Sequence, residues 1–141
     1  MKDTPKPRAD GQKTGLAGEF FVAAELLKRG LQTSLTLGNA KSIDLFAIND
    51  KGTQFSIQVK ALRSRNNYFP LDPTRIESAC VYVFVILNKP GIAAEFYVVP
   101  GADLHSEPGK FGKWFLGYQK FPGVHAKELA AYRDGWQIFE A

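Results

Sequence analysis

The stretch "SIDLFAINDKGTQFSIQVKALRSR", residues 42–65, decides the fold, because two apolar runs flank a short turn within it. "SIDLFAI" and "TQFSIQVKAL" have the composition of β-strands, and "NDKG" between them is made of turn-forming residues. The stretch therefore predicts a hairpin of two adjacent antiparallel strands. It also raises a question, because Asp44 lies among apolar residues and Gln58 and Lys60 interrupt the second run.

Alternation along the second strand sorts its side chains into two sets. Residues two apart on a strand share a face, so Gln58 and Lys60 project together. The residues that project the other way are all apolar: Phe55, Ile57, Val59 and Ala61. Asp44 has apolar neighbours on both faces of the first strand, and a carboxylate there is costly unless it is paired or bound to a metal.

Residues 14–30, "TGLAGEFFVAAELLKRG", predict an amphipathic helix with Thr14 as N-cap and Gly30 just after its end. The stripe expected to face the core is Leu16, Phe20, Ala23 and Leu27. Glu19 lies on the edge of this stripe and is the acid that can face the sheet. Residues 1–13 are polar and are expected to form a mobile tail, and residues 14–141 a single domain.

The rest of the chain predicts further strands and then helical pieces. Residues 79–87, "ACVYVFVIL", resemble a strand buried on both faces, and residues 93–99, "AAEFYVV", predict its return. Residues 113–121, "KWFLGYQKF", suit either a strand or an irregular segment, and residues 125–135 a short helix. One helix, a run of strands and helical pieces together predict an α/β fold, with helices flanking a central mixed sheet.

Composition narrows the classes of protein. A length of 141 residues with 45% hydrophobic residues suits one folded domain. No run is apolar and long enough to span a bilayer, and the N-terminus lacks the apolar core of a signal peptide, so we expect a cytoplasmic protein. The single cysteine, Cys80, cannot form an internal disulfide. A net charge of +4 is compatible with nucleic acid as a partner.

The polar residues of the hairpin and helix suit one site. Asp44, Gln58 and Glu19 offer the oxygen ligands that Mg²⁺ prefers, and an adjacent Lys60 can orient a water or balance a phosphate. These are the parts for metal-assisted hydrolysis of a phosphodiester. In the alternative interpretation Asp44 and Lys60 form a cross-strand ion pair, Gln58 is solvated on a half-exposed face, and Glu19 is only a first-turn acid that the helix dipole favours.

At these residues the chain resembles the PD-(D/E)XK nuclease superfamily. Among its members, the chain most resembles the small ones of the Holliday-junction-resolvase type. The resemblance covers roughly residues 14–63: a helix with an inward acid, a strand with Asp, a short turn, and "IQVKA". It implies a restriction-endonuclease-like core whose N-terminal helix packs on the sheet. The sequence departs from the family pattern at two positions. Ile43 stands in place of the usual proline, and Gln58 stands in place of the usual Glu or Asp, which gives a Gln-x-Lys variant of the motif.

The resemblance also implies roles for individual residues. Asp44, Gln58, Glu19 and the backbone carbonyl of Val59 would bind Mg²⁺ or Mn²⁺, and Lys60 would be the catalytic lysine. The implied activity is a metal-dependent endonuclease acting on DNA, including branched or structured DNA, with two copies pairing as a homodimer. The alternative is a nuclease-fold module that binds or interacts without catalysis.

Further basic residues are candidates for contact with DNA. We expect Lys41, Arg63 and Arg65 to reach phosphates beside the site. Residues 110–120, "KFGKWFLGYQK", interleave lysines with aromatic residues, as a nucleic-acid surface does, although an ordinary half-buried strand has the same composition.

Overall fold

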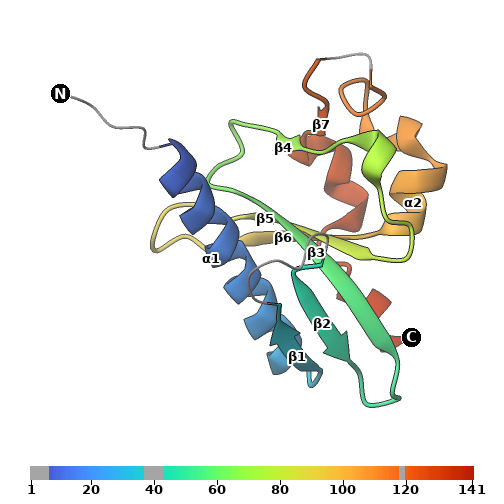
Figure 1. Cartoon of the computed structure of the whole chain (residues 1–141). Helices are drawn as coiled ribbons and strands as arrows, with labels where there is room; N and C mark the ends of the chain where they lie inside the picture. Colours follow the sequence, from blue (N-terminus) through green and yellow to red (C-terminus); the bar gives the residue numbers. More distant parts are fainter. Residues whose placement is uncertain (1–6, 37–42, 118–119) are drawn as a thin grey trace.

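The computed structural model describes residues 7–36, 43–117 and 120–141. Its centre is a five-stranded sheet in the order β1-β2-β3-β5-β6 (Figure 1). The strands are β1 (Gln32–Leu35), β2 (Leu45–Ile48), β3 (Gln54–Leu62), β5 (Val81–Ile86) and β6 (Glu95–Pro100). The central pair β3–β5 is parallel and the other pairs are antiparallel, so the predicted mixed sheet is confirmed.

The predicted hairpin is the pair β2–β3, in which Leu45 lies opposite Ile57. Its turn is held by Asn49, whose Oδ1 accepts hydrogen bonds from the backbone N–H groups of Lys51 (3.0 Å) and Thr53 (2.9 Å). Gly52 has a φ of 86°, a left-handed conformation that glycine adopts without steric cost. The turn residues recognised in the sequence therefore close the hairpin.

The sheet separates two hydrophobic cores. Helix α1 (Pro7–Lys28) covers one face, and the core between them, here the α1-side core, includes Val22, Leu45, Ile57 and Val83. The core on the opposite face, here the far-side core, includes Tyr82, Phe84 and Leu129. Strand β5 contributes to both cores in alternation and all six of its residues are buried, which confirms the prediction for this segment.

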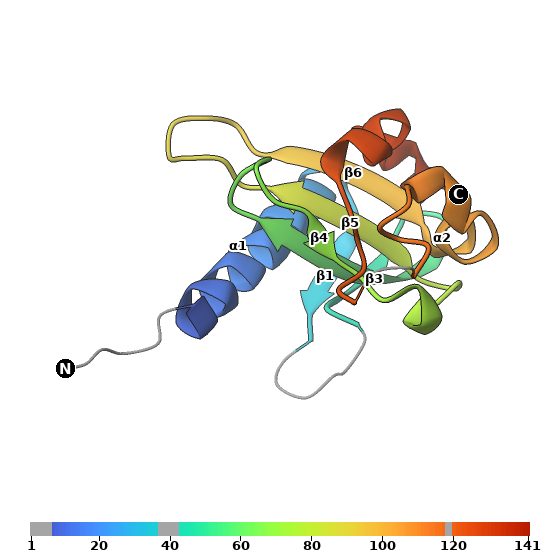
Figure 2. The same ribbon diagram turned by 90° about the horizontal axis from the view of Figure 1, so that it is seen from above.

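Short elements cover the far-side core. They are β4 (Phe69–Pro70), η1 (Pro73–Arg75), α2 (Gly101–Ser106), η2 (Pro108–Phe111), β7 (Gly123–Val124) and η3 (Ala126–Tyr132), while η4 (Trp136–Glu140) packs into the α1-side core. Figures 1 and 2 show α1 and α2 on opposite sides of the sheet. The helix predicted at residues 125–135 is the 3₁₀ helix η3, and residues 113–117 form turns rather than a strand.

Helix α1 differs from the prediction in its start and in its buried face. It begins at Pro7 rather than near Thr14, so residues 7–13 of the predicted tail are helical, while residues 1–6 lie outside the described chain. Three residues expected to face the core are instead largely exposed: Leu16 (51%), Phe20 (57%) and Leu27 (54%). The residues that do face the sheet include Gly18, Val22, Ala23 and Leu26.

The reason for this rotation is the short distance between α1 and the sheet. A Cβ atom on Gly18 would lie 2.7 Å from the Cβ of Ala61 and 3.4 Å from Cγ1 of Val59. Only a face with a glycine at this point can approach β3 so closely, and the larger side chains are therefore turned outward.

No helix in the described ranges is long and apolar enough to cross a membrane.

Candidate active site

Asp44 lies where β2 and β3 stop pairing. The ladder ends at Leu45 and Ile57, and the backbone N–H of Asp44 donates to the carbonyl of Ile57 (2.9 Å). The carboxylate oxygen Oδ2 then accepts the N–H of Val59 at 2.8 Å, so a side chain takes the place of the next backbone acceptor. This bond fixes the orientation of the carboxylate at the fork between the strands.

Glu19 of α1 meets Asp44 at this fork. Partial burial of its carboxyl group, the charge of Asp44 and a hydrogen bond with Asp44 together raise the pKa of Glu19 from its ordinary 4.5 to about 7. Near neutral pH the pair therefore tends to hold a proton between two acids. Two carboxyl groups placed so close together attract a cation, since a positive ion would offset their repulsion.

The neighbouring residue, Gly18, explains how Glu19 reaches this position. Because Gly18 lets α1 lie directly on Val59 and Ala61, the next residue of the helix is brought to the level of the strand fork. The stripe from which the inward position of Glu19 was predicted is wrong. The signal in the sequence that does indicate this position is the glycine immediately before Glu19.

Gln58 and Lys60 lie on the opposite side of β3 from Val59 and Ala61. Gln58 is 8% exposed, and its Nε2 donates to the hydroxyl of Tyr82 (3.2 Å), which also accepts the backbone N–H of Glu77 (2.9 Å). Lys60 is half-buried and stands in register with Phe84 of β5. Tyr82 was not a sequence candidate, because its position beside Gln58 depends on the parallel register of β3 and β5.

Strand alternation places Lys60, whereas the strand fork places Asp44. Ile57 points into the α1-side core, so alternation along β3 directs Lys60 toward the other side of the sheet. Asp44 precedes β2, and its carboxylate lies at the fork between β2 and β3, beside Glu19 of α1. Within the described ranges no ion pair joins Asp44 to Lys60, which removes the alternative interpretation of a cross-strand salt bridge. The structure therefore unites Glu19, Asp44 and the backbone of Val59, while the amide of Gln58 contacts Tyr82.

The basic residues predicted to contact DNA differ in their surroundings. Arg65 donates to the hydroxyl of Tyr97 (2.8 Å) and pairs with Glu95, so it stabilises the edge strand β6. Arg63 is exposed, and Lys41 lies outside the described residues. No cluster of three or more His, Cys, Asp or Glu side chains suited to a metal occurs in the described part of the chain.

Comparison with known proteins gives a likeness of fold. No family model matches the sequence, and no curated protein is significantly similar to it. The fold is similar to that of a bacterial homing endonuclease, I-Ssp6803I, with a TM-score of 0.59 and 19% sequence identity over 90% of this chain and 89% of that one. At this identity the likeness shows a shared fold, and it extends well beyond residues 14–63, on which the sequence resemblance rests.

Proposed function

We propose that the protein is a metal-dependent endonuclease that hydrolyses phosphodiester bonds in DNA, with a Gln-x-Lys variant of the PD-(D/E)XK site. The observation that carries this proposal is the pairing of Glu19 with Asp44 at the fork of β2 and β3. The likeness to an endonuclease fold supports it. Branched or structured DNA is the proposed substrate.

The donor set fits a hard divalent cation. Glu19 and Asp44 supply carboxylate oxygens, and the Val59 carbonyl and the amide oxygen of Gln58 are further candidates, so every proposed ligand is oxygen. Because Nε2 of Gln58 donates to Tyr82, its Oε1 is the end of the amide left for a cation. A bound Mg²⁺ or Mn²⁺ would act as a Lewis acid on the phosphate and lower the pKa of a bound water.

The remaining chemistry belongs to the side chains themselves. Asp44 is held in one orientation by the Val59 N–H, which preorganises the carboxylate. The ammonium of Lys60 can orient the attacking water or offset the charge that develops on the phosphate. Tyr82 holds the amide of Gln58 in place from the neighbouring strand.

Cleavage assays test the proposal with linear duplex, single-stranded and four-way-junction DNA, with Mg²⁺ and with EDTA. Asp44→Asn removes a ligand charge and Lys60→Ala the cation beside the phosphate, so each should lower cleavage at least ~100-fold. Asp50→Asn and Lys89→Ala make the same changes at exposed turn residues and should leave cleavage unchanged. The matched controls separate loss of the site from a general loss of charge.

Gln58→Glu distinguishes the enzyme from a binding module. In the enzyme, a carboxylate at this position should tighten Mg²⁺ binding, measured by calorimetry, and keep or raise cleavage. The neutral amide and its bond to Tyr82 are the features that favour a non-catalytic module, in which the same change alters neither Mg²⁺ affinity nor turnover. Wild-type protein that binds no Mg²⁺ and cuts no form of DNA would refute the nuclease proposal.

A further inference from the structure

Three rings from separate parts of the chain meet at the surface beyond the far-side core. The ring centroids of Tyr68 and Trp114 are 5.1 Å apart, those of Tyr68 and His125 5.6 Å, and those of Trp114 and His125 5.5 Å. Trp114 is 42% exposed, and Phe121 beside them is 67% exposed. We call these four residues, Tyr68, Trp114, Phe121 and His125, the aromatic platform.

The aromatic platform is held in place by the backbone. The Tyr68 hydroxyl donates to the carbonyl of Phe121 (3.2 Å), and the N–H of Gly123 donates to the carbonyl of Trp114 (3.2 Å). A Cβ on Gly123 would lie 2.3 Å from Cδ2 of Tyr68, so the tyrosine ring packs directly on the β7 backbone. The exposed rings therefore belong to a preorganised surface, which loses little conformational entropy on binding.

The two stretches of sequence that carry the aromatic platform are basic. Residues 60–71 and 109–127 together contain seven of the 18 Lys and Arg residues and none of the 14 Asp and Glu residues. The rest of the chain, with 11 basic and 14 acidic residues, is net negative, so these two stretches account for the net positive charge. They are joined in space by the pairing of β4 with β7.

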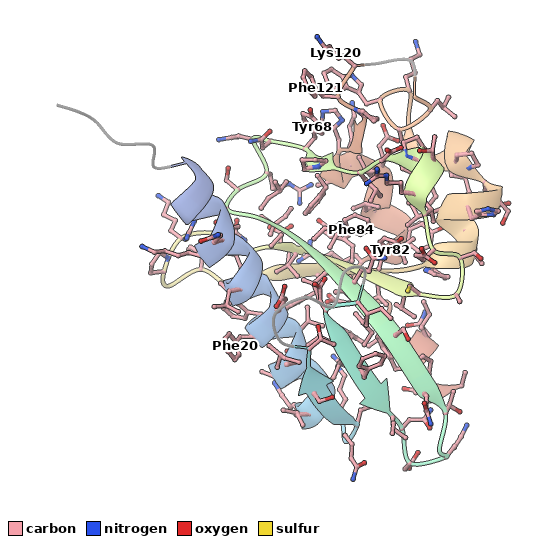
Figure 3. The ribbon with its side chains drawn as sticks, viewed as in Figure 1. Phe20, Tyr68, Tyr82, Phe84, Lys120 and Phe121 are labelled. Atoms are coloured by element: carbon pink, nitrogen blue, oxygen red, sulfur yellow. The ribbon has the colours of Figure 1, made fainter. Side chains whose placement is uncertain are left out.

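Several of these cations are available to a ligand. Arg65 is paired with Glu95, and Lys110 with Glu107 and Asp103. Lys113 and Lys120 are exposed and have no ion pair within the described ranges, and Nζ of Lys120 lies 5.8 Å from the ring centroid of Phe121. Figure 3 shows Lys120, Phe121 and Tyr68 together at one end of the molecule, away from Phe20 on α1.

We propose that the aromatic platform stacks unpaired bases of DNA, so that the substrate is single-stranded or locally opened beside the cleaved bond. Exposed rings bind the π-faces of bases regardless of sequence, and adjacent lysines follow the phosphates. The excess of cations over acids in these two stretches favours a polyanion over an ordinary protein partner. This inference rests on the proposed nuclease function, and β3 links Lys60 to the loop that carries Tyr68.

The two tryptophans of the chain allow a direct test. Trp136 is 4% exposed, so Trp136→Phe leaves the exposed Trp114 as the reporter, and Trp114→Phe leaves a buried one. Titration with an oligothymidylate in EDTA should quench the emission of Trp114 and leave that of Trp136 unchanged. Trp114→Ala and Phe121→Ala should each weaken binding of the oligonucleotide about 5- to 100-fold.

Matched controls separate stacking from general effects. Phe20→Ala removes an exposed ring from α1, 57% exposed against 42% for Trp114 and 67% for Phe121, and should not change the affinity for the oligonucleotide. Lys120→Ala should reduce the slope of log affinity against log salt by roughly 0.7, whereas Lys89→Ala should not. Because Phe121 is mostly in solvent, its replacement tests the aromatic platform even where Trp114→Ala affects folding.

The outcomes distinguish this inference from the nuclease proposal. Asp44→Asn should abolish cleavage and keep the quenching of Trp114. Quenching without cleavage by the wild type would refute the nuclease and support base stacking, while cleavage with unchanged binding by Trp114→Ala and Phe121→Ala would refute base stacking alone. If sedimentation shows that these variants lose self-association while DNA affinity is unchanged, the surface binds a second copy and the inference is wrong.

Discussion

At the scale of single residues, the two carboxyl groups of the acid pair, Asp44 and Glu19, are held in different ways. Asp44 is fixed by the Val59 N–H, whereas Glu19 has the raised pKa of about 7. A carboxyl group whose pKa is higher in the folded protein than in the unfolded chain binds its proton more tightly when folded. Its contribution to stability is therefore complete below pH 4.5 and is lost as the pH rises through about 7.

Glu19→Gln should consequently stabilise the protein at pH 8, because the amide cannot ionise beside Asp44. The gain should be on the order of 1 kcal/mol after discounting for solvent screening, and should shrink as the pH falls toward 5. Urea denaturation at several pH values measures it, with Glu25→Gln as the control, since Glu25 pairs with Arg29 instead. A gain that is the same at pH 5 and pH 8 would contradict the coupling of Glu19 to Asp44.

At the scale of elements, the contact between α1 and β3 depends on one glycine. Gly18→Ala improves helix propensity by about 1 kcal/mol, but the new Cβ meets Ala61 at 2.7 Å. Overpacking of this kind costs ~1–3 kcal/mol, so the variant should be less stable and should cleave DNA less well, because Glu19 moves away from Asp44.

Gly15→Ala is the matched control, because a Cβ at Gly15 meets nothing within 4 Å. It should stabilise the protein by up to ~1 kcal/mol, measured by thermal or urea unfolding. Adding Ala61→Gly to Gly18→Ala should restore part of the lost stability. Equal effects of the two glycine substitutions would show that the close approach of α1 to β3 is not a constraint.

The same contact explains why the helix face was predicted wrongly. The pattern of Leu16, Phe20 and Leu27 ranks positions by hydrophobicity, whereas the actual interface selects for small side chains near Gly18. The strands were easier to predict, because alternation and turn residues are local properties of the chain. The hairpin β2–β3 and the buried strand β5 were therefore recognised from sequence.

At the scale of the whole molecule, the order of the elements could be predicted from the sequence, but the register in which the strands pair could not. The parallel pairing of β3 with β5 places Gln58 beside Tyr82, and the pairing of β4 with β7 gathers the aromatic platform. Both depend on contacts between residues far apart in sequence. The roles of Asp44, Gln58, Lys60 and Glu19 in catalysis, and the pairing of two copies, stay predictions.

The acid pair and the aromatic platform also differ in how far apart their parts lie along the chain. Glu19, Asp44 and Val59 come from the contiguous run α1–β1–β2–β3, whereas the aromatic platform joins Tyr68 to residues 114–125. Closing a long loop costs more entropy, so contacts that are local in sequence tend to form first. The acid pair should therefore assemble in the folding transition state, before the aromatic platform exists.

Two identical substitutions in fully buried positions test this order. Val22 lies in α1 against the sheet, Val124 lies in β7, and both side chains are 0% exposed. The two substitutions are Val22→Ala and Val124→Ala. In stopped-flow folding, Val22→Ala should mainly slow folding, with a φ-value above about 0.5, while Val124→Ala should mainly speed unfolding, with a φ-value near zero. The reverse pattern would mean that the aromatic platform forms first and the acid pair last.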